Sequence, residues 1–338
     1  MNELSVNHLL GIKHLNVNDL NLIFKTADHF KEVINRSIKK VPSLRDITIA
    51  NLFFENSTRT KLSFELAEKR LSADIINFSS AQSSVKKGET LIDTVNNILS
   101  MKVDIVVLRH PNAGASELLA NNVNATIINA GDGANEHPTQ ALLDLYTIRK
   151  ELAATGRDID GLTIAMVGDL RHGRTVHSLC KLLCLYDNVK VVLVSPKELL
   201  LPAALIDAMR SSGVAVQTSE DLAPSIADVD IVYSTRIQEE RFGSKQEADL
   251  YRGRFRLNQA IYTEFCQPNT VIMHPLPRDS RADANELDND LNNNPNLAIF
   301  RQTDNGVLVR MALFALVLDV VDTVDKYSHD IRWFNARA

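Results

Sequence analysis

The sequence predicts an α/β protein of two doubly wound domains, each a mainly parallel sheet flanked by helices, joined by interdomain helices. Two observations lead to this prediction. Short apolar runs alternate with amphipathic stretches along most of the chain, which is the pattern of parallel strands covered by helices. The length of 338 residues also exceeds the size at which one hydrophobic core stops growing, so two domains are expected.

The first half of the chain begins with a helical pattern. Apolar residues recur at helical spacing within 14–40, which predicts one or two amphipathic helices. Four apolar runs then predict strands at 47–54, 74–79, 104–109 and 125–130. Helical stretches at 61–71 and 90–101 lie between them, and a further helix is expected at about 138–153. We place the first domain at residues 1–150.

The alternation starts again after a glycine-containing link at 154–161. Five apolar runs predict strands at 162–169, 189–196, 214–219, 230–235 and 270–275. These strands define a second domain at 151–300. Within it, the Asn- and Asp-rich segment 281–296 has no periodicity, so we expect a loop with at most one helical turn and identify no chemistry in it. A strongly apolar helix at 305–324 should pack back on the first domain, within a C-terminal segment 301–338.

The composition excludes several classes of protein. Apolar residues make up 45% and charged residues 23%, which argues against a disordered, collagen-like or coiled-coil chain. A net charge of -5 disfavours binding to nucleic acid or acidic lipid. No apolar run approaches the roughly 20 residues of a membrane helix, and the start lacks signal-peptide features. We therefore expect a cytoplasmic protein, in which Cys180, Cys184 and Cys266 stay free thiols.

A cluster of hydroxyl residues follows the first predicted strand. The run that precedes the next helix consists of Ser57, Thr58, Arg59 and Thr60. Ser57 is a natural N-cap, and a helix N-terminus exposes unpaired N–H groups and a partial positive charge. With the hydroxyls and Arg59, these groups predict a cradle for a phosphate. The simpler alternative is an ordinary capped helix without a ligand.

Four further segments are rich in groups of the same kind. They are 83–90, Arg109-His110-Pro111, 137–140 and 274–278. Apart from the first, each lies at or after the end of a predicted strand, the sheet edge at which ligands bind in open parallel sheets. The simpler alternatives are a solvated loop for Lys86 and Lys87, and a core histidine satisfied by backbone for His137.

Together these segments resemble the carbamoyltransferase superfamily over residues 8–322. The resemblance narrows to the aspartate branch through the segments GDLRHGRTVHSL (168–179), TRIQEERF (235–242) and HPLP (274–277). The ornithine branch would show a Cys in the last motif and an acidic segment with Ser-Met-Gly in the second domain, and neither is present. The loop 281–296 and the tail 325–338 exceed the usual length of the family, which concerns assembly rather than chemistry.

The resemblance implies a mechanism. Carbamoyl phosphate would bind first, with its phosphate held by Ser57, Thr58, Arg59 and Thr60. Thr60, Arg109 and His137 would act catalytically by donating to the carbonyl oxygen as it becomes an oxyanion. Gln140 and the backbone carbonyls of Leu276 and Pro277 would accept hydrogen bonds from the amino group of carbamoyl phosphate.

The same resemblance implies the second substrate and the assembly. L-aspartate would be bound by Lys87, Arg174, Arg236 and Gln238 and would become N-carbamoyl-L-aspartate, in an early step of de novo pyrimidine (UMP) synthesis. No metal or cofactor is expected. Ser83 and Lys87 would reach into the site of a neighbouring subunit of a homotrimer, and whether regulatory chains join a larger assembly stays open. No general base is evident, so we expect the departing phosphate to take the proton.

The same residues allow alternative functions, each with less support. Residues 168–175 lie one substitution from a P-loop, but Arg174 replaces its lysine, which disfavours an NTPase. The G-x-G-x-x-G spacing of a dinucleotide-binding domain is absent. His177, Cys180 and Cys184 share a helical face in an apolar stretch, which favours core packing over a metal site. A catalytically silent relative has little support, because every required site position is filled.

Overall fold

The computed structural model describes residues 3–79 and 88–321. Packing divides the chain into two compact units. The first comprises Met1–Leu10, Leu15–Ala130 and Val307–Ala338, and the second comprises Gly11–His14 and Gly131–Gly306. These units are discontinuous in sequence, whereas the predicted domains 1–150, 151–300 and 301–338 follow the chain linearly and stay a prediction.

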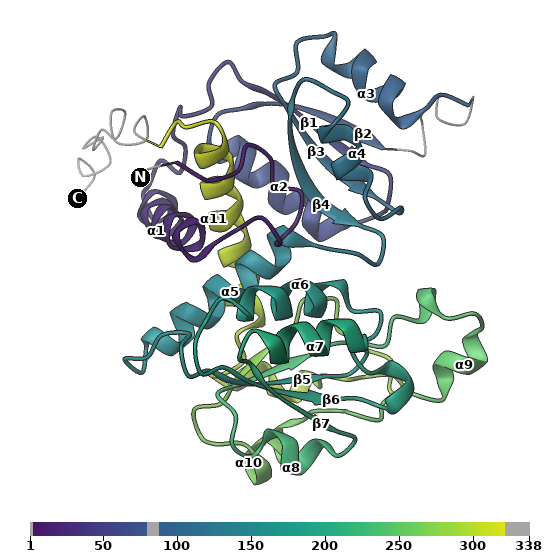
Figure 1. Ribbon diagram of the computed structural model, residues 1–338. Helices are drawn as coiled ribbons and strands as arrows, with labels where there is room; N and C mark the ends of the chain where they lie inside the picture. The colour runs from purple at the N-terminus through teal and green to yellow at the C-terminus, as the bar shows by residue number, and fades with distance from the viewer. Residues whose placement is uncertain (1–2, 80–87, 322–338) are drawn as a thin grey trace. The chain divides into compact units, whose positions relative to one another are not determined.

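The first unit contains a four-stranded sheet in the order β2-β1-β3-β4 (Figure 1). Its strands are β1 (Thr48–Phe53), β2 (Asp74–Ser79), β3 (Ile105–His110) and β4 (Thr126–Asp132). β1 pairs in parallel with both β2 and β3, so the carboxyl ends of these three strands lie at one edge. The predicted strands of this half are confirmed to within two residues at either end.

Helices cover both faces of this sheet. They are α1 (Val17–Ile34), α2 (Thr58–Arg70), α3 (Leu91–Leu99) and α4 (Ala115–Ala120). Leu52 of β1 lies in a buried cluster with Ile98 of α3 and Leu119 of α4. Side chains alternate between the two faces along a strand. Asn51, which precedes Leu52, therefore points to the opposite face, where it donates a hydrogen bond to Glu68 of α2. The helix predicted within 14–40 starts at Val17, because Asn16 caps its first turn.

The second unit contains a five-stranded sheet in the order β7-β6-β5-β8-β9. Its strands are β5 (Thr163–Val167), β6 (Lys190–Val194), β7 (Ala215–Ser219), β8 (Ile231–Ser234) and β9 (Val271–Met273). All four strand pairs are parallel, which confirms the predicted sheet. The order places β5 and β8 side by side in the middle, so the chain reverses its direction of winding there and leaves a crevice position at their carboxyl ends.

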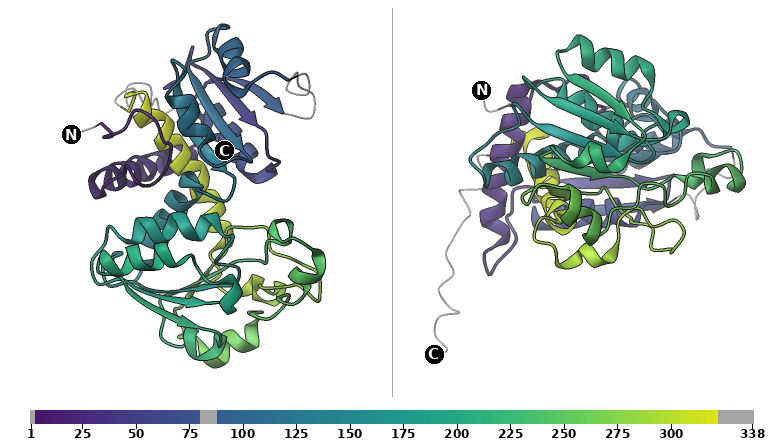
Figure 2. Two further views of the ribbon diagram at one scale, coloured as in Figure 1. Left: turned by 45° about the vertical axis from the view of Figure 1, so that its right-hand side comes forward. Right: turned by 90° about the horizontal axis from the view of Figure 1, so that it is seen from below.

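Two layers of helices flank the second sheet (Figures 1 and 2). One layer holds α5 (Pro138–Ala153), α6 (Arg174–Leu183) and α7 (Ala203–Ser211), and the other holds α8 (Leu222–Ile226) and α10 (Gln259–Phe265). The short helix α9 (Lys245–Asp249) projects beyond the sheet edge (Figure 1).

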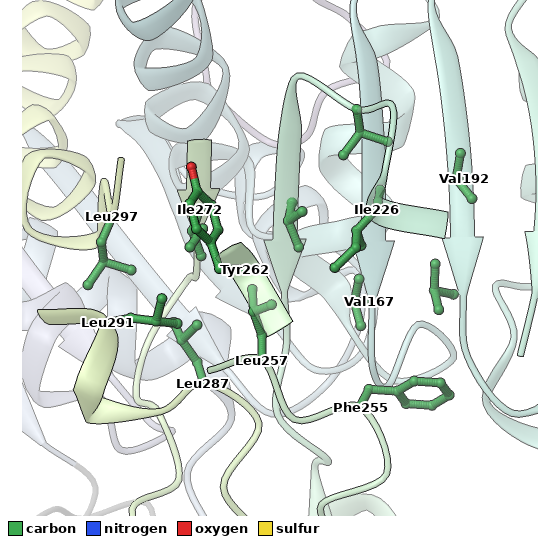
Figure 3. Close-up of a cluster of buried hydrophobic side chains, with 14 of the residues drawn as sticks. Val167, Val192, Ile226, Phe255, Leu257, Tyr262, Ile272, Leu287, Leu291 and Leu297 are labelled. Carbon is green, nitrogen blue, oxygen red and sulfur yellow. The ribbon is translucent and has the colours of Figure 1, made fainter. Parts of the chain in front are cut away.

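The segment 281–296 contributes to the core of the second unit. Leu287 and Leu291 pack with Leu257, Tyr262 and strand residues of one face of the sheet (Figure 3). The helical turn expected in this segment is a 3-10 helix, Asn289–Asn293. The segment thus lacks periodicity because it is irregular backbone, although its leucines are buried.

The helix α11 (Ile299–Val317) belongs to both units, since the chain passes from the second to the first after Gly306. It begins six residues before the predicted start at 305. The apolar pattern missed the residues before 305 because Gln302 is buried there as a polar partner of α5. Further along, Phe314 of α11 packs edge-on against Phe64 of α2, with ring centroids 5.9 Å apart. No helix within residues 3–79 and 88–321 is long and apolar enough to cross a membrane.

Candidate active site

The N-terminus of α2 is the first part of the site. Ser57 precedes the helix in an extended conformation, and its side chain makes no capping hydrogen bond. The first helical bond runs from the Lys61 N–H to the Ser57 carbonyl, 3.2 Å, so the N–H groups before Lys61 have no partner within the helix. Thr58 and Arg59 are exposed, whereas Thr60 is buried. This geometry provides backbone and hydroxyl donors for an anion.

Arg109 lies at the same sheet edge. It is the penultimate residue of β3 and lies beside Phe53 of β1, and the Phe54 N–H donates to the Arg109 carbonyl over 2.8 Å. The guanidinium is buried, with Nη1 donating to the Ala130 carbonyl at 3.1 Å and Nη2 to Glu55 Oε1 at 3.1 Å. Glu55 directly precedes the hydroxyl run, so the parallel pairing of β1 and β3 brings Arg109 to the region of the α2 N-terminus.

The N-terminus of α5 carries His137 and Gln140 in the second unit. His137 is the N-cap residue, Pro138 occupies the first turn, and the His137 N–H donates to Ser178 Oγ at 3.1 Å. Gln140 donates from Nε2 to Asp144 Oδ1 at 2.9 Å, one turn further along the helix. Both predicted residues therefore sit in the first turn of α5, with their positions fixed by neighbours that the sequence did not single out.

The loop after β5 places Arg174 at the start of α6. The backbone approaches the end of β8 so closely that a Cβ on Gly168, at φ +114°, would lie 2.1 Å from the Thr235 carbonyl oxygen. Only glycine fits that position. The Arg174 side chain is buried and donates from Nη1 to the Gly133 carbonyl at 2.6 Å. Arg241 donates to the same carbonyl from Nη2 at 3.0 Å, so two guanidinium groups converge there.

The loop after β8 carries Arg236 and Gln238. The Gln238 N–H donates to Asp169 Oδ2 at 3.2 Å, which ties this loop to the end of β5. Asp169 is fully buried and also contacts His172 Nδ1, at 3.1 Å from Oδ2. Arg236 is half-buried and donates from Nη1 to the Ile237 carbonyl at 3.1 Å. The adjacent parallel strands β5 and β8 thus bring the predicted aspartate-binding residues of this unit to one edge.

The loop after β9 carries Leu276 and Pro277, joined by a cis peptide bond. His274 is 1% exposed and accepts at Nδ1 from the Leu276 N–H, 2.8 Å. Its Nε2 lies 2.8 Å from Glu286 Oε1. Since Nδ1 accepts, the proton of a neutral ring is on Nε2 and is donated to Glu286. Burial lowers the pKa of His274, while the Glu286 hydrogen bond opposes that shift.

The residues of the metal alternative have other partners. His177 Nε2 bonds to the Leu170 carbonyl at 2.9 Å, and burial lowers the pKa of His177. Cys184 Sγ lies 3.3 Å from the Cys180 carbonyl, and Cys180 is fully buried. All three cysteines, including Cys266, are free thiols. Within the described part of the chain, no three His, Cys, Asp or Glu side chains form a potential metal cluster.

The structure groups the predicted site residues into two sets. In the first unit, Ser57 to Thr60 and Arg109 share one sheet edge. In the second unit, the remaining described residues occupy the α5 N-terminus and the loops after β5, β8 and β9: His137, Gln140, Arg174, Arg236, Gln238, Leu276 and Pro277. Ser83 and Lys87 lie outside the described residues.

Sequence reasoning missed several polar neighbours of these residues. Arg241 could have been found, because it is the second arginine of the TRIQEERF segment. Glu55, which contacts Arg109, could also have been found, because it lies two residues before the hydroxyl run. Glu286, which contacts His274, gave no such signal, because it lies in the aperiodic segment 281–296. Asp144 read as an ordinary polar helix position.

Two parallel α/β units, one with hydroxyl and backbone donors at a helix N-terminus and one with two arginines that meet at one carbonyl, fit the class of group-transfer enzymes for anionic substrates. The chain belongs to the aspartate/ornithine carbamoyltransferase family. The family's carbamoyl-P binding domain matches residues 7–150, and its Asp/Orn binding domain matches residues 160–317. Membership of this family removes the support for the NTPase and dinucleotide-binding alternatives.

Similar proteins cover nearly the whole chain. An aspartate carbamoyltransferase catalytic subunit of Cellvibrio japonicus is 59% identical, with 97% of each chain covered. The aspartate transcarbamoylase of Trypanosoma cruzi, solved with carbamoyl phosphate and aspartate, is 34% identical with a TM-score of 0.84, covering 91% of this chain and 96% of that one. The catalytic subunit of the M. jannaschii enzyme is 41% identical with a TM-score of 0.82, covering 93% and 99%.

Proposed function

We propose that this chain transfers the carbamoyl group of carbamoyl phosphate to the amino group of L-aspartate. The products are N-carbamoyl-L-aspartate and phosphate, an early step of de novo pyrimidine synthesis. The observation that carries the proposal is the α2 N-terminus, whose Ser57 side chain is not used for capping and which shares its sheet edge with Arg109. The identity of 59% to a Cellvibrio japonicus catalytic subunit supports both substrates.

The first unit holds the phosphate of carbamoyl phosphate. The N–H groups of the first turn of α2 and its positive dipole end attract the phosphate oxygens. The side chains that assist are Ser57, Thr58, Arg59 and Thr60. Arg109 bridges toward the carbonyl oxygen, and its contact with Glu55 is available for exchange because Glu55 is only half-buried.

Three donors act on the carbonyl oxygen. Thr60, Arg109 and His137 stabilise the negative charge that develops when the aspartate nitrogen attacks the carbonyl carbon and the bond to the phosphate oxygen breaks. Donors of this kind act mainly in the transition state, where removing one typically costs about 10² to 10³ in rate. Gln140 and the backbone carbonyls of Leu276 and Pro277 accept from the carbamoyl amino group and fix its orientation.

The second unit binds the two carboxylates of aspartate. Arg174, Arg236 and Gln238 supply planar donors that fit carboxylates, and Lys87 adds a further positive charge. A cationic ornithine side chain would be repelled by these groups. The chemistry of the displacement requires no metal and no cofactor.

The departing phosphate takes the proton that the attacking nitrogen loses. His274 cannot serve as the base, because Nδ1 is occupied by the Leu276 N–H and Nε2 carries the proton donated to Glu286. A pH–rate profile that follows the ionisation of a protein histidine instead of phosphate would contradict this assignment.

The proposed assembly is the one that the resemblance to the family implies. We infer a cytoplasmic homotrimer in which Ser83 and Lys87 complete the site of a neighbouring subunit, with regulatory chains as an optional addition. A solution molar mass equal to that of one chain would contradict the shared site.

The test is a phosphate-release assay on the purified chain with carbamoyl phosphate and either aspartate or ornithine. We expect release with aspartate alone. Arg59→Ala should lower kcat/KM for carbamoyl phosphate by about 10² to 10³, because it removes a phosphate donor. Arg236→Ala should mainly raise the KM for aspartate, because it removes a carboxylate donor.

Arg210→Ala is the matched control, since Arg210 is an exposed arginine of α7 whose contact is with Asp207 on the same helix. It should leave all constants unchanged. Release that depends on ornithine, or no release with either amino acid, would refute the proposed reaction.

A further inference from the structure

A buried carboxylate joins three elements of the second unit. Asp144 of α5 is fully buried. Its Oδ1 accepts from Gln140 Nε2 at 2.9 Å and from Gln302 Nε2 of α11 at 2.6 Å. Its Oδ2 accepts from the Tyr233 hydroxyl of β8 at 2.6 Å. Burial and the adjacent Asp144 raise the pKa of Tyr233 well above its usual range, so the hydroxyl stays a donor.

The network extends from Asp144 to the loop after β9. Gln302 donates to Asp144 with its amide nitrogen, and its Oε1 accepts from the backbone N–H of His274 at 3.1 Å. His274 in turn accepts at Nδ1 from the Leu276 N–H. One carboxylate is therefore connected on one side to Gln140 and on the other, through two residues, to the Leu276 backbone.

These contacts fix which atom Gln140 presents to a ligand. An amide side chain has one accepting end and one donating end, and its two orientations differ little in shape. Asp144 with its three donors acts as an acceptor, so it selects the orientation in which Gln140 turns its NH2 group inward. The Gln140 carbonyl oxygen is then the end left for a substrate N–H.

We propose that Asp144 is a positioning residue that makes the site selective for an acyl phosphate bearing an amino group. It acts through Gln140, whose Oε1 it orients, and through Gln302 and His274, which hold the backbone of Leu276. The inference rests on the proposed function, in which Gln140 and the Leu276 carbonyl accept from the carbamoyl amino group. Asp144 itself touches no substrate.

A purely structural role for Asp144 is the competing explanation, because the residue also links α5 to α11. The chain contains a matched control for that role. One turn along the same two helices, Asn305 Nδ2 donates to Thr147 Oγ1 at 3.0 Å, and Thr147 is also fully buried. Thr147→Val breaks this link without touching Gln140, so it should lower stability and leave substrate selectivity unchanged.

The experiment compares carbamoyl phosphate with acetyl phosphate, which has a methyl group in place of the amino group. Asp144→Leu should lower kcat/KM for carbamoyl phosphate by about 10², the usual cost of a misplaced reacting group. The inhibition constant of acetyl phosphate against carbamoyl phosphate should change by less than about threefold, since this ligand gives Gln140 no N–H to accept. Asp144→Asn should retain most of the selectivity, because its one oxygen can still accept from both glutamines.

A double-mutant cycle supplies the decisive arm. In a Gln140→Ala background, Asp144→Leu should have a much smaller effect on kcat/KM than in the unaltered chain, because the residue through which it acts is already absent. Equal effects in both backgrounds, or equal losses for both acyl phosphates, would overturn the inference.

If Asp144→Leu does not fold, Gln302→Leu tests the second branch, because it breaks the link from Asp144 to the backbone of His274. The inference is supported if kcat/KM for carbamoyl phosphate falls several-fold more than the affinity for acetyl phosphate. It is overturned if both change by the same factor. The unaltered chain separates this outcome from the proposed function. If it releases no phosphate with aspartate, the proposed function fails; if it does and the variants keep the ratio, only the role of Asp144 fails.

Discussion

Asp144 in the second unit and Glu68 in the first are both fully buried, yet their surroundings differ. Asp144 receives three side-chain hydrogen bonds, from Gln140, Gln302 and Tyr233. Glu68 of α2 receives one, from Asn51 Nδ2 at 2.8 Å. Burial removes the hydration of a carboxylate, and several hydrogen-bond donors can replace it, whereas a single donor is insufficient. The number of donors, more than burial itself, therefore decides whether a buried carboxyl group can work as a fixed acceptor.

The protonation of Glu68 follows from this shortage. Burial raises its pKa to about 8, with the Asn51 hydrogen bond opposing the shift. Among the described residues, neither Glu68 Oε1 nor Asn51 Oδ1 has a hydrogen-bond partner. Both are acceptors when Glu68 is ionised, so a proton on the carboxyl group supplies the donor that is missing. We expect Glu68 to be largely neutral at pH 7.

The largest expected effect is on the pH dependence of stability in Glu68→Gln. The folded pKa of about 8 lies above the usual value of 4.5, so the folded chain holds the proton more tightly than the unfolded chain. The stabilisation of the fold by the protonated Glu68 is fully present below pH 4.5 and is lost as pH rises through 8. Glutamine cannot ionise and can donate to Asn51, so the variant should gain of the order of 3–5 kcal/mol at pH 9.

Urea denaturation between pH 5 and pH 9 measures this difference. Glu65→Gln is the matched control, because Glu65 lies one turn earlier on α2 and is only partly buried, near Lys61 at 3.9 Å. It should show a much smaller alkaline gain, because the charge of Glu65 raises the pKa of Glu68 less than burial does. A parallel pH dependence of Glu68→Gln and the unaltered chain would show that Glu68 is ionised in the fold.

The same neutralisation at Asp144 should have the opposite sign. Asp144→Asn replaces one accepting oxygen by an NH2 group, so at least one of the three surrounding donors loses its acceptor. A buried donor left unsatisfied costs about 1–3 kcal/mol. Denaturation of this variant beside Glu68→Gln provides the direct comparison, and a gain in stability for both would mean that the donors around Asp144 do not compensate its charge.

The fold and most of the candidate site could be predicted because both depend on local patterns. Parallel strands buried on both faces give continuous apolar runs, and hydroxyl and arginine residues recur at the ends of such runs, as in the segment after β1. The start of α11 was missed because Gln302 is buried as a polar partner of α5 and adds nothing to the apolar pattern.

The positioning residues could not be predicted for a related reason. Asp144 and Gln302 are 158 positions apart in sequence, and Glu286 reaches His274 from an aperiodic segment. A polar residue on a helix usually faces solvent, and only the tertiary structure shows that these face one another. The sequence therefore predicted the residues proposed to contact substrate, while the groups that orient them required the structure.

A third carboxylate, Glu239, extends the comparison to the surface. It lies in the loop after β8 and pairs with Arg252 at 2.8 Å and with Arg281, and hydrogen bonds from these two arginines lower its pKa. Because its pKa is lowered, ionised Glu239 stabilises the fold above pH 4.5, and this stabilisation is lost in acid. The pH dependence is thus the reverse of that at Glu68. The side chains of Glu239 and Arg281 are 22% and 48% exposed, so solvent screens their contact and its net stabilisation is small.

Glu239→Gln should therefore lower the free energy of unfolding by no more than about 1 kcal/mol. The loss should shrink in high salt, because salt screens exposed ion pairs far more than buried hydrogen bonds. Denaturation of this variant and Asp144→Asn in low and high salt separates the two cases. A loss at Glu239 that matched the one at Asp144 and resisted salt would mean that arginine pairing at the surface compensates a carboxylate as well as three buried donors do.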